Sequence, residues 1–316
     1  PEPLGHVFDR IVLVTLDTTR ADALGSYAGP PTPHFDRLAR EGVRFAEART
    51  VAPITLPSHA SILTGRFPFE HGVRDNGSFR LPDGATTLAE RLDEAGYSSA
   101  AVVASVVLHS QYGLAQGFGT WVEPPTALEV EAYERTRPAA DVVDDALRLA
   151  REGHLAPPFF LWVHFFDAHY PYHGAGSGSE HGATPPSGTD REAYARAVAT
   201  MDREVGRLLA ELERRAGRSG LLTAVVADHG EGLGDHGERT HGFQLYDSTL
   251  RVPMIVHGPG VAPAVVRDPV SVVDLAPTLL ALTGVAPGGG GGSVGIGGVD
   301  LLSSGAPRSP VAFEAC

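Results

Sequence analysis

Short apolar runs rich in β-branched residues alternate along the chain with segments whose apolar residues recur every three or four positions. The first pattern is typical of buried strands and the second of amphipathic helices. Strands are predicted at Arg10–Leu16, Ser98–Val103, Phe159–Phe165, Leu221–Ala227 and Pro253–His257. Helices are predicted at His34–Glu41, Ser58–Thr64, Thr86–Ala95, Ala139–Arg151, Arg191–Ala216 and Val270–Thr283. This alternation indicates βαβ units, so we expect an α/β fold with a mostly parallel sheet.

The composition narrows the classes of protein to which the chain can belong. Of its 316 residues, 42% are hydrophobic and 20% are charged, a globular balance that excludes disordered and fibrous chains. A net charge of −13 without a basic block argues against nucleic acid as a partner. No apolar run approaches ~18 residues, so we expect no membrane span. Cys316 is the single cysteine, which excludes a disulfide within the chain.

Two segments rich in glycine, serine and proline interrupt the pattern, at residues 174–188 and 287–298. We expect the second to be a Gly-rich surface loop and the first to be a flexible loop near the site, with a plain solvated loop equally open. The chain begins at Pro1 and stops just after a strand-like stretch, Pro310–Ala315, so we expect both ends to be cut. The compartment (periplasmic, extracellular or cytoplasmic) and the oligomeric state stay open.

Acidic residues and histidines follow three of the predicted strands. Asp17 follows the first strand, Asp167 and His169 follow the third, and Asp228 and His229 follow the fourth. Because sites in open α/β sheets form at the carboxyl ends of the strands, we expect these side chains to meet there. Carboxylate oxygens and imidazole nitrogens suit Zn²⁺, Mn²⁺ or another divalent ion.

The segment at residues 228–241 is unusually dense in such groups and also carries Glu231 and His241. We expect Glu238 to be plain surface charge, and the same interpretation is open for Asp235 and His236.

A second candidate lies in the stretch VAPITLPSHASILTGRFP, where a short helix is predicted to begin near Ser58 with Pro57 at its first position. This places the hydroxyls of Thr55 and Ser58 at a helix N-terminus, where free backbone N–H groups favour an anion. A hydroxyl there can act as a nucleophile if a metal lowers its pKa, or it can simply cap the helix.

Taken together, the stretches IVLVTLDTTRADALGSY, VAPITLPSHASILTGRFP, FFLWVHFFDAHYPY and VVADHGEGLGDHGERTHG resemble the sulfatase family of the alkaline-phosphatase superfamily. The resemblance spans about residues 7–315 as one catalytic domain. It implies a three-layer α/β/α sandwich with a mostly parallel central sheet. The small C-terminal subdomain that is usual in the family is missing here, which we interpret as truncation.

The resemblance also implies roles for individual residues. The family's first metal-binding Asp corresponds to Asp17, its nucleophile to Thr55, which also contacts the metal, and its second metal pair to Asp228 and His229. His169 corresponds to the histidine that contacts the transferred group or the leaving oxygen. In two-metal members a second ion is held by further ligands, for which the candidates here are Asp167, His241 and either His169 or His173.

Three residues besides His169 are candidates for contacting the substrate anion. His59 occupies the position of an arginine in the family's motif, and Arg20 follows Asp17 closely, although a salt bridge to neighbouring acids is equally open for Arg20. His173 is a third candidate for this role.

The departures from the family pattern bear on the reaction. True sulfatases carry Cys or Ser in a Cys/Ser-x-Pro-x-Arg motif that is oxidised to formylglycine, whereas this chain has Thr55 and His59 at the two ends of that motif. Threonine cannot be converted by that route. A threonine nucleophile resembles the phosphodiesterase, phosphonate-hydrolase and phosphotransferase branches of the superfamily.

We therefore predict a metal-dependent hydrolase that cleaves phosphate mono- or diesters through Thr55, with one or two divalent ions (Zn, Mn or Ca). The substrate is expected to be a small-molecule or glycan-type anionic ester. Two alternatives stay open: a sulfuric ester hydrolase that works without formylglycine, and a catalytically inactive member that binds a ligand. A dinucleotide-binding module is excluded, because the turn after the first strand reads DTTRAD and lacks the required glycines.

Overall fold

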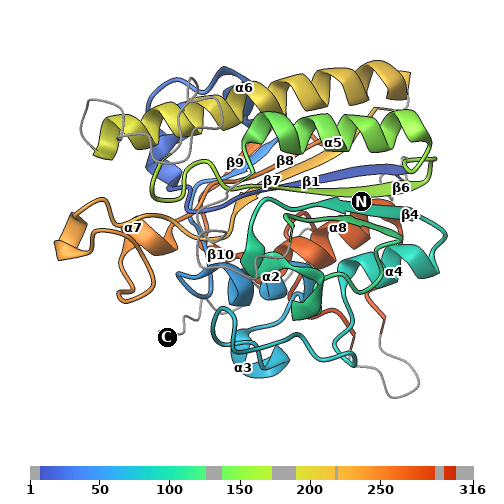
Figure 1. Ribbon diagram of the computed structural model, residues 1–316. Coiled ribbons are helices and arrows are strands. Elements are labelled where there is room, and N and C mark those ends of the chain that lie inside the picture. Colours follow the sequence, from blue (N-terminus) through green and yellow to red (C-terminus); the bar gives the residue numbers. More distant parts are fainter. Residues whose placement is uncertain (1–7, 126–136, 173–189, 218–219, 289–294, 304–316) are drawn as a thin grey trace.

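The computed structural model describes residues 8–125, 137–172, 190–217, 220–288 and 295–303. Figure 1 shows a central sheet with helices on both of its faces. The fold is therefore the predicted α/β/α sandwich, built on a mixed but mostly parallel sheet.

The main sheet has eight strands within the described residues. In spatial order they are β5 (Thr120–Val122), β4 (Ser98–Val102), β6 (Phe159–Phe165), β1 (Arg10–Leu16), β7 (Leu222–Ala227), β8 (Met254–His257), β2 (Val43–Phe45) and β9 (Ala264–Val266). Strand β8 pairs antiparallel with both β7 and β2, and the other pairs are parallel. A second, two-residue pairing joins β3 (Ala48–Arg49) to β10 (Val270–Ser271).

Strand β1 lies at the centre of this sheet, between β6 and β7. Its register pairs Leu16 with Phe165 on one side and with Ala227 on the other, so three strands end side by side. The apolar residues of all three strands are buried, as expected for parallel strands covered on both faces. Residues that follow these strands are thereby brought to one edge of the sheet.

Two helical layers cover the sheet. One contains α1 (Pro33–Glu41), α5 (Ala139–Glu152) and α6 (Asp190–Ala216), and the other contains α2 (Thr55–Thr64), α4 (Leu88–Glu94) and α8 (Leu275–Thr283). The short helices α3 (Pro68–His71) and α7 (Asp247–Leu250) lie outside these layers. The buried residues of α6, which include Ala197, Met201, Val205 and Leu212, recur every three to four positions and face the sheet layer.

Most predicted elements are confirmed, with some differences in their bounds. Strands β1 and β6 have the predicted limits, whereas β2, β3, β5, β9 and β10 were not predicted. Helix α2 begins at Thr55, three residues earlier than predicted, so Pro57 is its third residue and not its first. Helix α8 begins at Leu275, because Val270–Ser271 form strand β10 and Val272–Asp274 form a 3-10 turn.

The two loop predictions fall partly or wholly outside the described residues. Residues 174–188 lie outside them, and so do residues 289–294 of the Gly-rich segment. The described ends of the Gly-rich segment are anchored: the backbone N–H of Ile296 donates to Pro287, and that of Gly297 donates to Thr64 at the end of α2. Among the described residues, none of the helices combines the length and the apolar character needed to cross a bilayer.

Candidate active site

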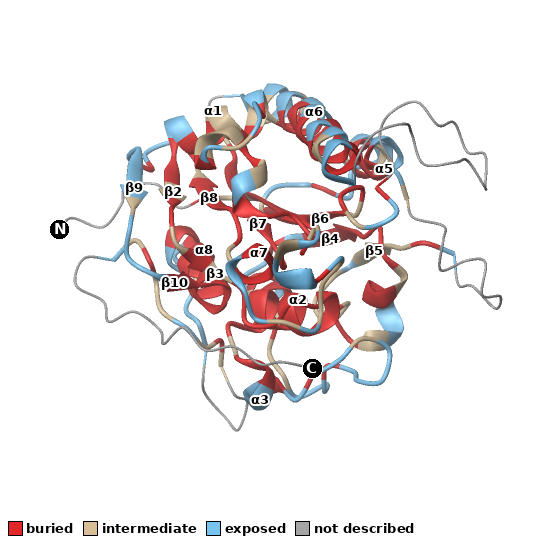
Figure 2. Cartoon of the chain, turned by 90° about the vertical axis from the view of Figure 1, so that its left-hand side faces the viewer, coloured by how far each residue is buried: buried red, intermediate tan, exposed pale blue. Residues whose placement is uncertain are grey.

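Three buried side chains converge where β1 and β7 end. Asp17 follows β1, and Asp228 and His229 follow β7. One ligand atom from each of them lies within 4.8 Å of the others, and all three side chains are fully buried. Figure 2 looks toward this end of the molecule, where α7 lies in front of β7 and the neighbouring α2. The structure thus brings together three of the five residues that the sequence places after strands.

Two carboxylate oxygens of this cluster have no hydrogen-bond partner among the described residues. They are Oδ1 of Asp17 and Oδ2 of Asp228, both buried. A buried carboxylate oxygen without a partner is costly, because its charge has lost the solvation that water provides. A bound cation would remove that cost.

The tautomer of His229 strengthens this argument. Its Nδ1 lies 2.9 Å from the carbonyl oxygen of Gly230, which can only accept, so Nδ1 carries the proton. The lone pair of Nε2 therefore faces Oδ2 of Asp228 at 3.3 Å and Oδ1 of Asp17 at 3.8 Å. Acceptors facing each other at these distances repel one another unless a cation lies between them.

The pKa values of these groups shift in the direction that burial without a counter-ion produces. Burial raises the pKa of Asp17 and raises the pKa of Asp228 further, because the charge of Asp17 adds to the effect on Asp228. Burial lowers the pKa of His229 well below its ordinary value, which keeps the ring neutral. The donor set of two carboxylates and a neutral imidazole fits a divalent metal ion.

Further hydrogen bonds fix both carboxylates. Oδ1 of Asp228 accepts the backbone N–H of His229 at 2.7 Å and that of Thr18 at 3.1 Å. Thr18 reaches this position with a φ of 51°, an uncommon conformation for a β-branched residue. Its carbonyl oxygen is held by the hydroxyl of Tyr194 on α6 at 2.8 Å. The strained turn after β1 therefore positions the backbone N–H of Thr18 to donate to the carboxylate of Asp228 after β7.

The hydroxyl of Thr55 lies beside the cluster, at the first residue of α2. Its Oγ is 3.4 Å from Oδ2 of Asp17 and 3.4 Å from Nε2 of His229. The hydroxyl of Ser58 has a different task, because it donates to the carbonyl oxygen of Asp228 at 2.7 Å. Ser58 thus ties α2 to the residues after β7, and Thr55 is the hydroxyl that faces the cluster.

The N-terminus of α2 offers fewer free donors than the sequence suggests. Pro57 has no N–H, and the N–H of Leu56 donates to Oδ1 of Asn76 at 2.8 Å. Asn76 is a residue that the sequence analysis missed, because nothing in its own segment links it to α2. It fixes the backbone next to Thr55.

A pair of histidines extends the cluster toward the surface. The ring of His241 lies 4.4 Å from that of His229 and 5.1 Å from that of His169, measured between centroids. Nδ1 of His169 donates to the carbonyl of Tyr170 at 2.6 Å, so its Nε2 carries a lone pair. Burial lowers the pKa of His169, so the neutral ring suits a base or a ligand better than a proton donor.

Glu231 orients His241 from below. Its carboxylate is fully buried, and Oε1 lies 3.2 Å from Nδ1 of His241, so Nδ1 donates and Nε2 carries the lone pair. A carboxylate that accepts from the far ring nitrogen of a histidine in this way fixes the tautomer and orientation of the ring. Glu231 has no assigned role in the sequence analysis, although it stands three residues after Asp228.

Asp167 does not join the cluster. Its Oδ1 accepts the backbone N–H of Ala139 at the start of α5, at 3.1 Å, and burial raises its pKa to about 7. Its assignment as a metal ligand stays a prediction without support from the geometry. His173 lies outside the described residues.

His59 is enclosed in the core instead of facing a substrate. The side chain is fully buried, with Nδ1 donating to the carbonyl of Thr55 at 2.8 Å and Nε2 bonded to the hydroxyl of Thr15 at 3.1 Å. Both ring nitrogens are occupied, and burial lowers the pKa of His59 to about 3. This corrects the expectation of a substrate contact, and His59 braces the first turn of α2.

Arg20 is likewise occupied by the protein. Its guanidinium bonds both oxygens of Asp22 and pairs with Asp235 at 2.7 Å, and it also donates to the carbonyl of Glu231. The salt-bridge alternative for Arg20 therefore describes the structure, in place of a free contact with the anion.

Glu238 corrects a second expectation, because it is only 5% exposed and is not plain surface charge. Its Oε1 accepts the backbone N–H groups of Phe243 and Gln244 at 2.9 and 3.3 Å. Asp235 pairs with Arg20 and Arg191, and the ring of His236 stacks on that of Tyr246.

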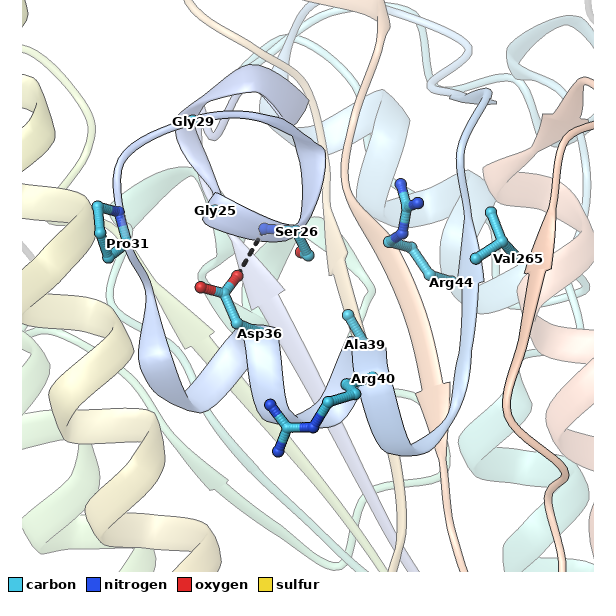
Figure 3. A pocket seen from close by; sticks show the side chains of 9 residues that line it. All are labelled: Gly25, Ser26, Gly29, Pro31, Asp36, Ala39, Arg40, Arg44 and Val265. Carbon is cyan, nitrogen blue, oxygen red and sulfur yellow. Dashed lines mark hydrogen bonds between the residues drawn. The ribbon is translucent and has the colours of Figure 1, made fainter.

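A cavity of about 560 Å³ lies elsewhere on the molecule, between the turn before α1, α1 itself and strands β2 and β9. Figure 3 shows its lining, in which Asp36 accepts the backbone N–H of Ser26 and Arg40 and Arg44 supply positive charge. None of the residues predicted for the site lines it. The chemistry of the buried cluster, and not cavity size, therefore defines the candidate active site.

Comparison with known proteins shows the family to which the chain belongs. The sequence profile described as Sulfatase matches residues 9–285. The chain therefore belongs to the sulfatase family. This confirms the resemblance in the sequence.

Two curated relatives show the range of similarity. The Ulvan-active sulfatase of Formosa agariphila is 28% identical over 317 residues, which cover 87% of this chain and 61% of the relative. The N-acetylgalactosamine-6-sulfatase of Canis lupus familiaris is 28% identical, covering 88% of this chain and 62% of the relative. The chain thus spans about three fifths of the length of these relatives.

Solved structures show the same fold. One determined in complex with its substrate D-glucosamine-2-N,6-O-disulfate has a TM-score of 0.72 at 20% identity, covering 96% of this chain and 82% of its own. The phosphonate monoester hydrolase of Silicibacter pomeroyi has a TM-score of 0.67 at 21% identity, covering 88% of this chain and 73% of its own.

Proposed function

We propose that the protein is a metal-dependent ester hydrolase in which Thr55 is the nucleophile and sulfate monoesters are the first substrate class. The observation that carries the proposal is the position of the Thr55 hydroxyl, 3.4 Å from both Asp17 and His229 at the edge of the cluster. The sequence ranks phosphate esters first, but the curated relatives are mostly named sulfatases, which favours the sulfate alternative.

Asp17, Asp228 and His229 are the residues that would hold a divalent ion. When bound, such an ion supplies a Lewis acid that polarises an oxygen of the ester and lowers the pKa of a nearby hydroxyl. The proposal includes one or two bound ions, with Zn²⁺, Mn²⁺ and Ca²⁺ as the candidate metals.

The chain's own residues account for the positioning and the proton transfers. Thr55 is held at the start of α2 with Oδ2 of Asp17 in reach of its hydroxyl proton. As Asp17 takes that proton, Oγ attacks the sulfur or phosphorus in line and the bond to the ester oxygen breaks, which leaves a Thr55 ester. The departing oxygen takes a proton from water, and Asp17 returns its proton to Oγ when the Thr55 ester is hydrolysed. Water then hydrolyses this ester, with the lone pair on Nε2 of His169 taking the proton of the attacking water.

A second candidate is hydrolysis of phosphate or phosphonate esters. Two observations favour it: Thr55 presents a plain hydroxyl, and phosphonate monoester hydrolases are among the structural neighbours. A catalytically inactive, ligand-binding member is the remaining alternative, against which the gathered Asp17, Thr55 and His229 argue.

The test compares three esters of one phenol, a sulfate monoester, a phosphate monoester and a phosphate diester, each offered to metal-loaded protein. We expect the highest kcat/KM for the sulfate ester. A preference for either phosphorus ester selects the second candidate. No turnover of any ester by folded protein with bound metal would overturn the proposal in favour of the inactive member. Asp228→Asn serves as the matched background control.

A further inference from the structure

Exposed large apolar side chains occur in the two segments that carry His169 and His241. Seven are exposed among the described residues, and four of them lie in the segments that carry His169 and His241. These four are Tyr170, Phe243, Leu245 and Tyr246. The exposure of Phe243 is the greatest, at 81%. An exposed apolar patch beside reacting groups indicates a surface that a ligand covers.

The backbone under Phe243 is firmly held, so its exposure is not the product of a loose loop. Its N–H donates to the buried carboxylate of Glu238 at 2.9 Å. The preceding turn is closed by backbone hydrogen bonds from Gly232 to Thr240 and from Gly234 to Glu238. The buried carboxylate of Glu238 thus fixes the backbone that carries this exposed ring.

The two residues that precede Phe243, His241 and Gly242, relate it to the candidate site. His241 stands two residues earlier, with its ring 4.4 Å from that of His229. Gly242 has a φ of 104°, and a Cβ placed there would lie 3.4 Å from the side chain of Ile54, the residue before Thr55. Phe243 therefore follows directly on a residue that lies against Ile54, and it is two residues from a histidine of the candidate site.

The segment that carries His169 and Tyr170 contacts the segment that carries Arg239 and His241. The guanidinium of Arg239 lies over the ring of Tyr170, 5.1 Å from its centroid, and the rings of His169 and His241 are 5.1 Å apart. The anionic end of an ester would reach Thr55 between these segments. Its alcohol would then extend outward, past Phe243.

We propose that Phe243 forms the leaving-group subsite and selects esters whose alcohol is a ring with an apolar face. This inference rests on the proposed function. An aryl ring and a pyranose share that chemistry, because both offer a flat face of C–H or π surface to an aromatic side chain. The subsite contributes binding of the alcohol and takes no part in the bond-making step.

The test measures kcat/KM for three esters of the acid, sulfuric or phosphoric, that the test of the proposed function selects. Their alcohols are phenol, the 6-hydroxyl of methyl glucopyranoside, and 2,2,2-trifluoroethanol, which has no ring. We expect Phe243→Ala to lower kcat/KM for at least one ring ester roughly three- to tenfold and to leave the trifluoroethyl ester within twofold. Phe243→Tyr, which keeps a ring, should retain the wild-type ratios. A loss confined to the phenyl or to the glucoside ester identifies which ring the subsite takes.

Phe69 on α3 supplies the matched control, because it is also an exposed phenylalanine, at 61%, and packs on Phe67 away from the cluster. Phe69→Ala should change none of the three values more than twofold. An equal loss on all three esters, or no loss on any, in Phe243→Ala would overturn the subsite while leaving the proposed function intact. Failure of the wild type to hydrolyse any ester would overturn both.

Discussion

The Nε2–H of His164 donates to Oδ2 of Asp17 across 3.2 Å, from β6 to the end of β1. The tautomer is fixed from the other side, because Nδ1 of His164 accepts the backbone N–H of Ala104 at 3.2 Å. Burial lowers the pKa of His164 to about 3, so the ring is a neutral donor at physiological pH. His164 thus turns Oδ1 of Asp17 toward Asp228 and His229.

Removing this donor should weaken metal binding. We expect His164→Phe to raise the dissociation constant for the bound divalent ion roughly 10- to 100-fold, as loss of a side chain that hydrogen-bonds a metal ligand does elsewhere. Titration calorimetry with metal-free protein checks this. His257→Phe is the matched control, because His257 ends β8 at the opposite end of the sheet. Equal affinities in wild type and His164→Phe would show that the hydrogen bond does not orient Asp17.

Metal binding should stabilise the fold by mass action. Free metal at 100 times its dissociation constant is expected to add about 2.7 kcal/mol to the free energy of unfolding. Chemical denaturation with the metal and with a chelator measures the difference. Asp228→Asn should lose most of this gain, whereas Asp235→Asn, which alters a partly buried ion pair with Arg20 outside the cluster, should keep it. A full gain in Asp228→Asn would exclude Asp228 as a ligand.

His71 should make the fold sensitive to acid. Nε2 of His71 bonds Ser61 of α2 at 2.9 Å and Nδ1 accepts the N–H of Val73, so the neutral ring is the bonded form. Burial lowers the pKa of His71 to about 4. The unfolded chain takes up a proton near pH 6.5 and the folded chain does not, so stability falls as the pH falls through this window.

Between pH 7.5 and pH 5, this uptake costs about 2 kcal/mol of unfolding free energy. We expect His71→Gln to lack that part of the pH dependence in urea denaturation at the two pH values. His154→Gln, which changes an exposed histidine, should retain it. The same slope in all three proteins would contradict the assignment.

Local sequence patterns predict the long buried strands of this fold but not its short ones. β1 and β6 are long, buried and rich in β-branched or aromatic residues, so their limits are visible in the sequence. Strands β2 and β9 have three residues each, which is too short for a period to show. Their places depend on pairing with distant strands.

Site residues that follow from local sequence were predicted correctly, whereas residues whose roles depend on distant contacts had to be corrected. Asp17, Asp228 and His229 could be predicted because parallel strands deliver their final residues to one edge. The roles of His59 and Glu238 depend on partners that the chain folding supplies, such as Thr15 for His59 and the N–H of Phe243 for Glu238. Side-chain type alone carries no information about those partners.

The most direct test of the central claim is the turnover of the preferred aryl ester by Thr55→Ala and Thr55→Ser beside the wild type, all three at equal metal occupancy. We predict that Thr55→Ala lowers kcat by roughly 1,000-fold or more, because the nucleophile is gone, while Thr55→Ser keeps measurable turnover. A kcat for metal-loaded Thr55→Ala within tenfold of the wild type would contradict a threonine nucleophile.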